Sequence, residues 1–170
     1  MTALARLPDP PFLAVERPRD RRLVDGLIAR AFGPGRFAKT AERLRETSAP
    51  ILDLSFVAWS EREVVGCVRL WPIVIGETPA LLLGPFAVEE AWRSQGLGAA
   101  LIRRAVEEAT AAGHDVILLV GDEPFFGPLG FSPARAAVLP GPVDPRRVLV
   151  RALRPSAADQ LSGPVIAVPA

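Results

Sequence analysis

A glycine-rich stretch, Arg93-Ser-Gln-Gly-Leu-Gly98, offers the clearest chemistry in the sequence. It lies between an apolar run, 80–88, and a segment with helical periodicity, 98–112. Glycines let a backbone approach a ligand closely, and the first N–H groups of a helix are unpaired at its positive dipole end. The stretch therefore predicts a pyrophosphate site, with an ordinary tight turn as the competing interpretation.

Two other phosphate-binding motifs can be compared with the same residues. A P-loop requires lysine and then serine or threonine after its second glycine, whereas Gly98 is followed by Ala99 and Ala100, which excludes it. A dinucleotide-binding motif requires a third glycine or alanine and an acid after the next strand. Leu101 fits the first requirement poorly, although Asp122 lies roughly where the acid is expected. A dinucleotide enzyme stays open as an alternative.

The stretch must be positioned by the segments on either side of it. Ala80–Val88 is apolar throughout, which predicts a strand covered on both faces. Because proline cannot donate to a strand ladder, Gly84-Pro85 predicts a bulge or a local break there. Gly98–Ala112 predicts an amphipathic helix, and Val116–Val120 predicts a second buried strand. Strand, loop, helix and strand form a crossover unit, which is expected to be right-handed.

The rest of the chain predicts strands and helices around this unit. The expected strands are Phe12–Val15, Leu54–Trp59, Val64–Leu70 with a continuation to Ile75, and Val148–Leu153. The expected helices are Arg19–Phe32, with Leu23, Leu27, Ile28 and Ala31 on its apolar side, a charged helix Phe37–Thr47 on the outside, and a short helix to Leu129 capped by Asp122. We expect one domain over 1–170, with 1–11 and 154–170 loosely ordered ends and a short edge strand within the latter.

Composition restricts the classes of partner. The 170 residues carry a formal net charge of +1, which does not favour capture of nucleic acid or of an anionic membrane surface. One cysteine, Cys67, and one histidine, His114, cannot build an ordinary zinc site, so no metal is expected. The lone cysteine fits a reducing cytoplasm, and no run is long enough to span a membrane. We expect a small-molecule or peptide partner; whether the chain also forms a homodimer stays open.

At this point the sequence resembles a known family. Arg93-x-x-Gly96-x-Gly98, preceded by Leu83–Val88, is similar to the central cofactor motif of Gcn5-related N-acetyltransferases (GNAT). Phe125-Phe-Gly-Pro-Leu-Gly-Phe131 resembles the terminal motif of that family, an aromatic pair before a Gly-Phe. Gly121–Pro124 resembles the small bacterial single-domain members.

The resemblance implies an α+β fold: one mixed, mostly antiparallel sheet flanked by helices, in which strands 80–88 and 116–120 run parallel and splay apart. It implies acetyl-CoA, or another short acyl-CoA, as co-substrate and a primary amine as acceptor. The pantetheine arm would enter the gap between the two strands, and the pyrophosphate would rest on the loop. The implied cofactor-binding residues are Phe86, Ala87, Val88, Arg93, Ser94, Gln95, Gly96, Leu97, Gly98, Ala99 and Phe126. The acceptor pocket would be lined by segments 19–47 and 134–147, where no residue pattern identifies the acceptor.

One departure from the family concerns proton transfer. Many members use a tyrosine of the terminal motif to protonate the departing thiolate, whereas this chain has no tyrosine and Phe126 stands at the matching place. A thiol can leave as thiolate, so the enzyme interpretation survives, with a non-catalytic acyl-CoA binder of the same fold as its alternative. The Phe86 amide is the predicted donor to the thioester carbonyl. The general base stays unassigned among the candidates considered, which are Cys67, Glu89, Glu90, His114 and Asp122.

Overall fold

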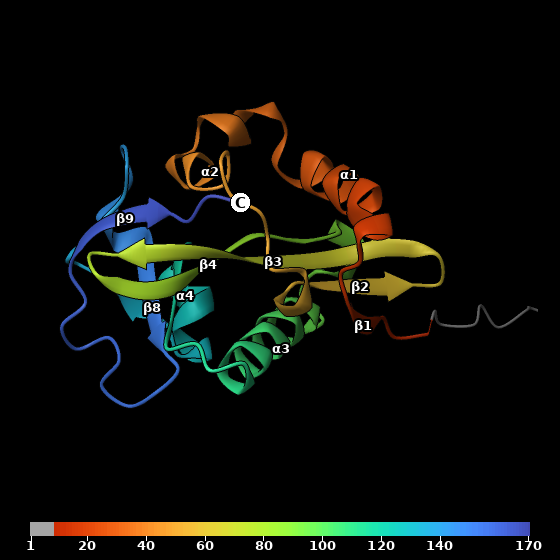
Figure 1. Ribbon diagram of the computed structural model, residues 1–170. Helices are drawn as coiled ribbons and strands as arrows, with labels where there is room; N and C mark the ends of the chain where they lie inside the picture. Colours follow the sequence, from red (N-terminus) through yellow and green to blue (C-terminus); the bar gives the residue numbers. More distant parts are fainter. Residues whose placement is uncertain (1–8) are drawn as a thin grey trace, which may run out of the picture.

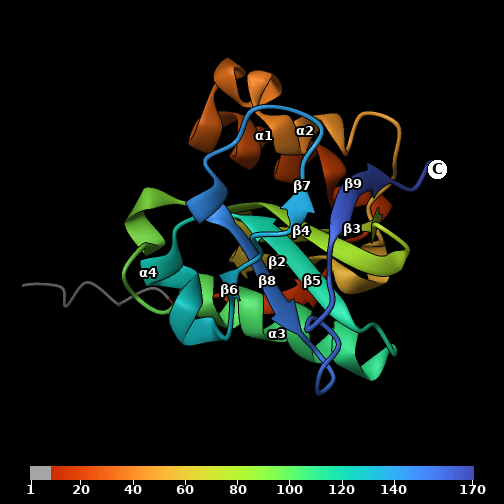
Figure 2. The same ribbon diagram turned by 90° about the vertical axis from the view of Figure 1, so that its left-hand side faces the viewer.

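The computed structural model describes residues 9–170 and shows a sheet between two layers of helices (Figures 1 and 2). The main hydrogen-bonded order is β1-β2-β3-β4-β5-β8-β6, while β9 pairs with β3 and β7 pairs with β9. β4 and β5 run parallel, as do the short β7 and β9, and the other pairings are antiparallel. The predicted mixed, mostly antiparallel sheet with flanking helices is confirmed.

The elements have the following bounds. The strands are β1 Phe12–Val15, β2 Phe56–Ser60, β3 Glu63–Ile75, β4 Thr78–Val88, β5 Val116–Val120, β6 Ser132–Pro133, β7 Ala137–Val138, β8 Val148–Ala152 and β9 Gly163–Ala167. The α-helices are α1 Arg21–Phe32, α2 Thr40–Arg43, α3 Leu97–Ala111 and α4 Glu123–Phe126. Short 3₁₀ helices cover Pro18–Asp20, Pro34–Ala38, Leu52–Leu54, Glu90–Trp92, Gly127–Leu129 and Pro145–Arg147. Most predicted strands therefore lie within one or two residues of their expected bounds.

The helix α3 covers one face of the sheet, below it in Figure 1. Its side chains Leu101 and Ile102 are fully buried and pack in one cluster with Phe56 and Leu81 of the strands. The polar positions predicted on the opposite side, among them Arg103, remain exposed. The 3.6-residue period that predicts this helix is thus the period of its buried stripe.

The helix α1 covers the opposite face, above the sheet in Figure 1. Val24, Leu27 and Ile28 are buried against sheet residues that include Cys67. The prediction placed Leu23 on this apolar side, which is wrong, because Leu23 is 47% exposed. The buried stripe is centred nearer to Val24, so that Leu23 lies at its edge.

The helix predicted over Phe37–Thr47 is wrong in extent. A 3₁₀ helix covers Pro34–Ala38, Lys39 is extended with φ −75° and ψ 139°, and α2 is a single turn, Thr40–Arg43. The segment has few apolar residues on one side, so little burial supports a longer helix. The segment lies on the outside, as predicted, with most of its side chains exposed, and Leu44 anchors it as a buried residue of the cluster beneath.

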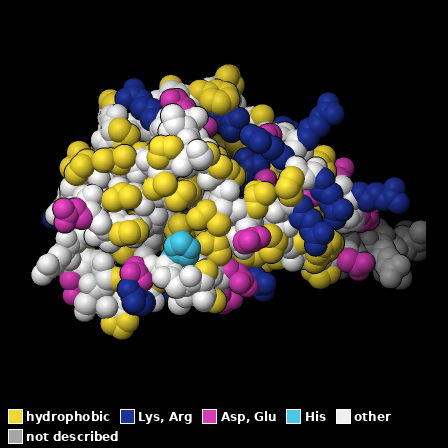
Figure 3. Space-filling model, viewed as in Figure 1, with side chains coloured by type: hydrophobic (Ala, Val, Ile, Leu, Met, Phe, Trp, Pro, Cys, Tyr) yellow, Lys and Arg dark blue, Asp and Glu magenta, His cyan; other side chains and the backbone are white. Residues whose placement is uncertain are grey.

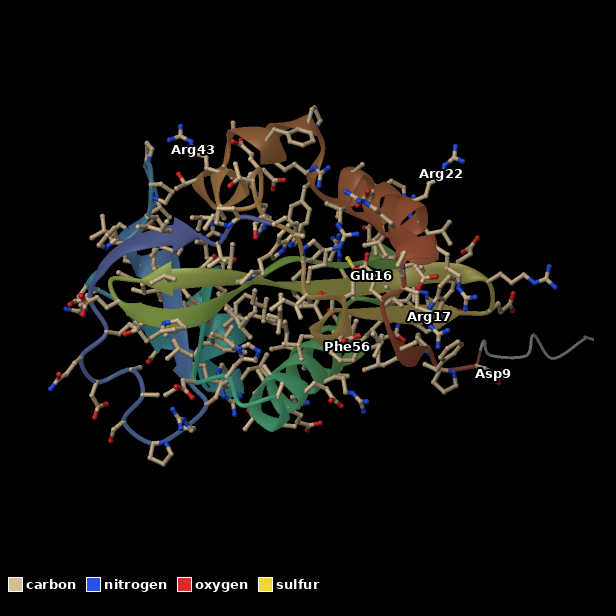
Figure 4. The ribbon with its side chains drawn as sticks, in the orientation of Figure 1. Asp9, Glu16, Arg17, Arg22, Arg43 and Phe56 are labelled. Carbon is tan, nitrogen blue, oxygen red and sulfur yellow. The ribbon has the colours of Figure 1, made fainter. Side chains whose placement is uncertain are left out.

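A buried ionic cluster joins β1, α1 and β3. The Arg69 guanidinium donates to Glu16 through Nε at 2.9 Å and Nη2 at 2.6 Å, and to Asp25 through Nη1 at 2.9 Å. Figure 4 shows Glu16 between the strand layer and α1. Removal of Arg69 or Glu16 would leave the other charged and buried, which typically costs about 3–5 kcal/mol, whereas the Asp25 side chain is 46% exposed. The cluster therefore fixes α1 over the sheet.

The C-terminal segment returns to the middle of the sheet. β9 is the predicted short strand, and it pairs antiparallel with the second half of β3, with Val74 opposite Ile166. Val165 is 2% exposed, and the Ala170 amide donates to the Thr47 carbonyl. Of the predicted loose N-terminal stretch, residues 1–8 lie outside the described part of the chain.

Candidate functional site

The strand β4 carries a bulge at Gly84-Pro85, where the sequence predicts a break. Val68 lies opposite Phe86 and Leu70 lies opposite Leu83, so β4 contains one more residue than β3 over this interval. Gly84 has φ +131°, a conformation that side chains with a Cβ rarely adopt. In a regular strand Leu83 and Phe86 would face opposite sides of the sheet. Because of the bulge, both pack toward the α3 side.

A tryptophan from the neighbouring strand holds the bulge. The Trp71 indole Nε1 donates to the Gly84 carbonyl at 2.5 Å, and this contact is buried. A buried indole N–H requires a partner, and the bulge removes this carbonyl from regular pairing. Trp71 therefore fixes the backbone of β4 at the point where its register changes.

The two parallel strands separate immediately beside this bulge. β4 and β5 are paired only at Leu81–Ile117 and Leu82–Leu118. Beyond this point a cavity of about 800 Å³ lies between Leu83–Val88 on one strand and Leu119–Asp122 on the other. This volume is within the range typical of small-molecule sites. The predicted splay of the strand pair is confirmed.

The glycine-rich loop forms one end of the cavity. Ser94 and Gly96 have φ +61° and +82°, and Gly96 is the N-cap residue of α3 without a side-chain hydrogen bond. In residues 9–170 no acceptor contacts the amides of Leu97, Gly98 and Ala99. Around Gly96 the space where a Cβ would stand is open to 4 Å. The loop thus presents three free amides at the positive end of a 15-residue helix.

The side chains of this loop do not all face the cavity. Arg93 Nε donates to the Val88 carbonyl at 3.0 Å, which ties the loop to the end of β4. Gln95 is exposed and donates to the Ala91 carbonyl, and Leu97 is buried in the core beneath α3. Neither Gln95 nor Leu97 lines the cavity. The predicted residues that do are Phe86, Ala87, Val88, Arg93, Ser94, Gly96, Gly98, Ala99 and Phe126.

Aromatic rings separate this end of the cavity from the core. Phe86 stacks on Phe125 at 5.8 Å between centroids, and Phe126 meets Phe86 edge-on at 6.0 Å. Phe126 is 8% exposed and also packs against Phe131, so it is both a core residue and part of the cavity wall. A Cβ on Gly98 would stand 3.0 Å from the Phe86 ring. Gly98 therefore permits the close approach of α3 to β4.

The opposite wall comes from the segments that we predicted around an acceptor pocket. Residues of the stretch 31–45 line the cavity from the α1 side, together with residues 142–147. Thr40 Oγ1 donates to the Pro142 carbonyl, which joins the two segments. Four charged residues of the first segment line the cavity: Arg36, Lys39, Glu42 and Arg45.

Arg45 and Glu42 form a half-enclosed ion pair in this wall. Arg45 Nη1 donates to Glu42 Oε2 at 2.9 Å, and the two side chains are 12% and 16% exposed. Burial lowers the pKa of the Arg45 guanidinium, and this effect outweighs the negative charge of Glu42, which raises that pKa. Arg45 Nε is buried and has no hydrogen-bond partner among the described residues. Sequence analysis missed this pair, because an i,i+3 pair of charges is usually exposed on a helix surface.

Asp122 stands at the N-cap of α4, but the predicted side-chain cap is wrong. Its backbone carbonyl accepts from the Phe125 and Phe126 amides, while its carboxylate accepts from Arg147 Nε at 3.1 Å. The ion pair with Arg147 lies at the rim of the cavity, in place of a cap.

The remaining candidate bases lie away from the cavity or are occupied. Glu89 accepts from Arg30 at 2.6 Å, and Cys67 is fully buried in the sheet. Burial raises the pKa of the Cys67 thiol to about 12, so it stays protonated at neutral pH. His114 follows α3 and is the cyan group on the surface in Figure 3. The predictions of a core cysteine and a loop histidine are confirmed.

Residues 9–170 were compared with the requirements of a metal site and of a membrane-spanning helix. This part of the chain has no group of three or more His, Cys, Asp or Glu side chains suited to a metal ion. Within the same residues, no helix combines the length and the apolar character that a membrane crossing requires.

The chain is similar in sequence to known acetyltransferases. Residues 53–133 match the family model described as an acetyltransferase (GNAT) domain. The uncharacterized N-acetyltransferase YhbS of Escherichia coli K12 is 32% identical over 122 residues, which cover 70% of this chain and 72% of YhbS. Residues 53–133, which match the family model, contain the bulged strand, the glycine-rich loop and the aromatic pair.

Solved structures agree with this assignment. The crystal structure of Escherichia coli YhbS in complex with CoA superposes with a TM-score of 0.81 and 25% identity, covering 94% of this chain and 90% of that one. A GNAT acetyltransferase from Brucella melitensis in complex with acetyl-CoA has a TM-score of 0.69 at 24% identity and covers 93% and 96% of the two chains. The mostly antiparallel sheet is also unlike the doubly wound parallel sheet of a dinucleotide enzyme. The chain belongs to the GNAT acetyltransferase family.

Proposed function

We propose that this protein transfers an acetyl group from acetyl-CoA to a primary amine. The observation that carries the proposal is the cavity between β4 and β5, which runs from three free helix amides to the bulge at Gly84-Pro85. Family membership and the bound CoA of the YhbS structure support it.

The loop end of the cavity suits the pyrophosphate of coenzyme A. The amides of Leu97–Ala99 have no partners among the described residues, and an anion there would meet both their N–H groups and the helix dipole. The absence of side chains at Gly96 and Gly98 lets the phosphates approach the backbone. Arg93 is held by Val88, so we expect it to add a modest charge contribution.

The strand end suits the pantetheine arm and the thioester. Phe86, Ala87 and Val88 pair with β3 on one side and line the gap on the other. The Val88 carbonyl already accepts from Arg93, and the remaining outward backbone groups are available to an extended amide chain. Acetyl-CoA supplies an activated acyl group, whose carbonyl carbon the amine attacks. We assign the Phe86 amide to donate to the carbonyl oxygen as negative charge develops, since Pro85 lacks an N–H.

Proton transfer must work without tyrosine. The amine must reach the carbonyl in its neutral form and then lose a proton, while the sulfur leaves with the C–S electron pair. Phe126 cannot donate a proton, so the thiolate departs as an anion and takes its proton from water. Turnover is therefore expected to depend strongly on pH through the acceptor amine.

A non-catalytic acyl-CoA binder is the second candidate, and the observation in its favour is the same phenylalanine. Phe126 stands where many relatives carry an acid, and it packs among Phe86, Phe125 and Phe131 without a polar group. Such a protein would bind CoA and release no thiol. For either candidate we infer a cytoplasmic location, in keeping with the single unpaired thiol of Cys67.

An amine screen separates the two candidates. Purified protein is incubated with acetyl-CoA and a broad set of amines, free thiol is recorded, and each product is identified by mass. An enzyme releases thiol only with certain amines, in amounts equal to the acetylated product. Calorimetry in parallel should show CoA binding; binding without thiol release on any amine would support the sensor, and no binding would refute both.

A further inference from the structure

The wall of the cavity opposite the CoA loop carries an excess of positive charge. Arg36, Lys39 and Arg45 line it from the segment after α1, where Glu42 is the carboxylate, and residues 142–147 add one further charge of each sign, Asp144 and Arg147. Two of the cations already face aromatic rings: Arg36 lies over Phe37 and Lys39 over Phe32, at 4.4 and 5.2 Å from the centroids. Arg45 differs because it lies deeper, with only 12% of its side chain exposed.

Arg45 is short of partners for a buried guanidinium. Among the described residues its side chain has one hydrogen-bonding partner, Glu42, which takes Nη1. Nε is buried without a partner, and Nη2 would stand 2.7 Å from a Cβ on Gly84. An arginine can offer five N–H groups, and burial without partners is costly. The edge formed by Nε and Nη2 is therefore the part of the side chain left for a ligand.

The position of Arg45 relates this ligand to the reaction. Nη2 lies against Gly84, and Gly84 is two residues before Phe86, which we assign to the thioester carbonyl. A Cβ on Gly84 would stand 2.7 Å from Nη2 and 3.9 Å from the Phe86 amide nitrogen, so these two nitrogens lie at most about 6.6 Å apart. A group bound by Arg45 is thus a few bonds from an amine placed for attack, which is the spacing within an amino acid.

We propose that the acceptor is an amino acid or a close derivative, whose carboxylate binds Arg45 beside the transferred acetyl group. A guanidinium edge and a carboxylate match as a planar pair of charge-assisted hydrogen bonds. Glu42, paired with Nη1 at the other side of Arg45, holds the guanidinium in place. This mode of binding requires a turn of the guanidinium that exposes the buried Nε to the cavity. This proposal rests on the proposed acetyltransferase function.

The test compares each amino acid with its own carboxamide, which keeps the amine and removes the negative charge. For the parent protein we expect kcat/KM to be about 10- to 100-fold higher for the acid than for the amide, the factor expected of one charge-assisted pair. Arg45→Met should remove this preference mainly by raising KM for the acid. Arg45→Lys, which keeps the charge without the planar edge, should recover it only in part.

Arg43→Met is the matched control on the same turn. Arg43 lies at the outer edge of the molecule in Figure 4; its side chain is exposed, donates to the Pro140 carbonyl at 2.9 Å and does not line the cavity. This variant should keep the parent preference. Because loss of Arg45 leaves Glu42 unpaired, the double variant Glu42→Gln/Arg45→Met guards against a folding defect, with CoA binding as the check of the fold.

The outcomes separate this inference from the function on which it rests. If no acid turns over, calorimetry of the same acids and amides with CoA already bound gives the same comparison. The assignment of Arg45 would be overturned if amides bind or react as well as acids, or if Arg45→Met still prefers acids. In both cases, observed CoA binding would leave the proposed acetyltransferase function standing. Failure of CoA itself to bind would overturn the proposed function.

Discussion

The two walls of the cavity are built in different ways. The wall that we propose for CoA presents backbone groups: three free amides, two glycines and a bulged strand, all placed by α3 and β4. The wall that we propose for the acceptor presents charged side chains, which stand on short turns between α1 and β2. A backbone site binds any ligand with the common phosphate shape, whereas a side-chain wall can differ between relatives of one fold. We therefore expect changes on the two walls to affect different ligands.

The largest expected effect is that of Gly98→Val. A Cβ at this position would already stand 3.0 Å from the Phe86 ring, and two further methyl groups would fill the approach to the loop amides. CoA affinity should fall at least about 100-fold by calorimetry, because more than one charge-assisted hydrogen bond is lost. The control is Gly26→Val in α1, where a Cβ meets only the tip of Arg30. If Gly98→Val keeps both its fold and its CoA affinity, the phosphate-loop assignment is wrong.

A smaller effect is expected from Trp71→Phe, which removes the donor to the Gly84 carbonyl. A buried carbonyl without a partner costs about 1–3 kcal/mol, and this loss should appear in the free energy of unfolding by chemical denaturation. The bulge should also become less well fixed, so that kcat falls more than CoA affinity. Trp59→Phe on β2, away from the cavity, serves as the control. Equal losses in both variants would show that Trp71 contributes packing alone.

Arg93→Ala should weaken CoA binding up to about fivefold, as expected of an exposed charge worth roughly 1 kcal/mol or less. The side chain also holds Val88, so part of the loss comes from a looser loop. The measurement is the CoA dissociation constant at low and at high salt. An affinity equal to that of the parent at low salt would show that neither the charge of Arg93 nor its contact with Val88 contributes to CoA binding.

The smallest expected effect on binding is that of Phe126→Tyr. The ring already forms part of the cavity wall, so an added hydroxyl should leave CoA affinity near the parent value and can speed thiol release by supplying an acid. Calorimetry and turnover are measured on the same preparation. Loss of CoA binding would mean that the new oxygen disturbs the packing with Phe86 and Phe131.

The CoA wall could be predicted because its signals are local. Glycines at fixed spacing between an apolar strand and a periodic helix predict the loop, and a proline in that strand predicts the bulge. Gln95 and Leu97 show the limit of this approach. Their backbone lies in the loop, but the Gln95 side chain faces solvent and the Leu97 side chain faces the core. These directions depend on how the first turn of α3 is oriented about the helix axis.

The acceptor wall could not be predicted because its signals are not local. The helix expected over Phe37–Thr47 is replaced by two short turns, which Thr40 ties to Pro142, about a hundred residues further on. Arg45 is buried by contacts with β4 that no periodicity reveals. The assignment of this segment to the acceptor pocket comes from the family resemblance and stays a prediction, and the place of its charged residues in the cavity wall required the structure.

The most direct test of the division between the two walls is a CoA titration into three proteins: the parent, Gly98→Val and Arg45→Met. Calorimetry under identical conditions gives the three dissociation constants. We predict at least about a 100-fold loss of CoA affinity in Gly98→Val. In Arg45→Met the CoA affinity should be near that of the parent, since CoA without an acyl group does not require the acceptor wall. A loss in Arg45→Met as large as that in Gly98→Val, or unchanged binding in both, would contradict this prediction.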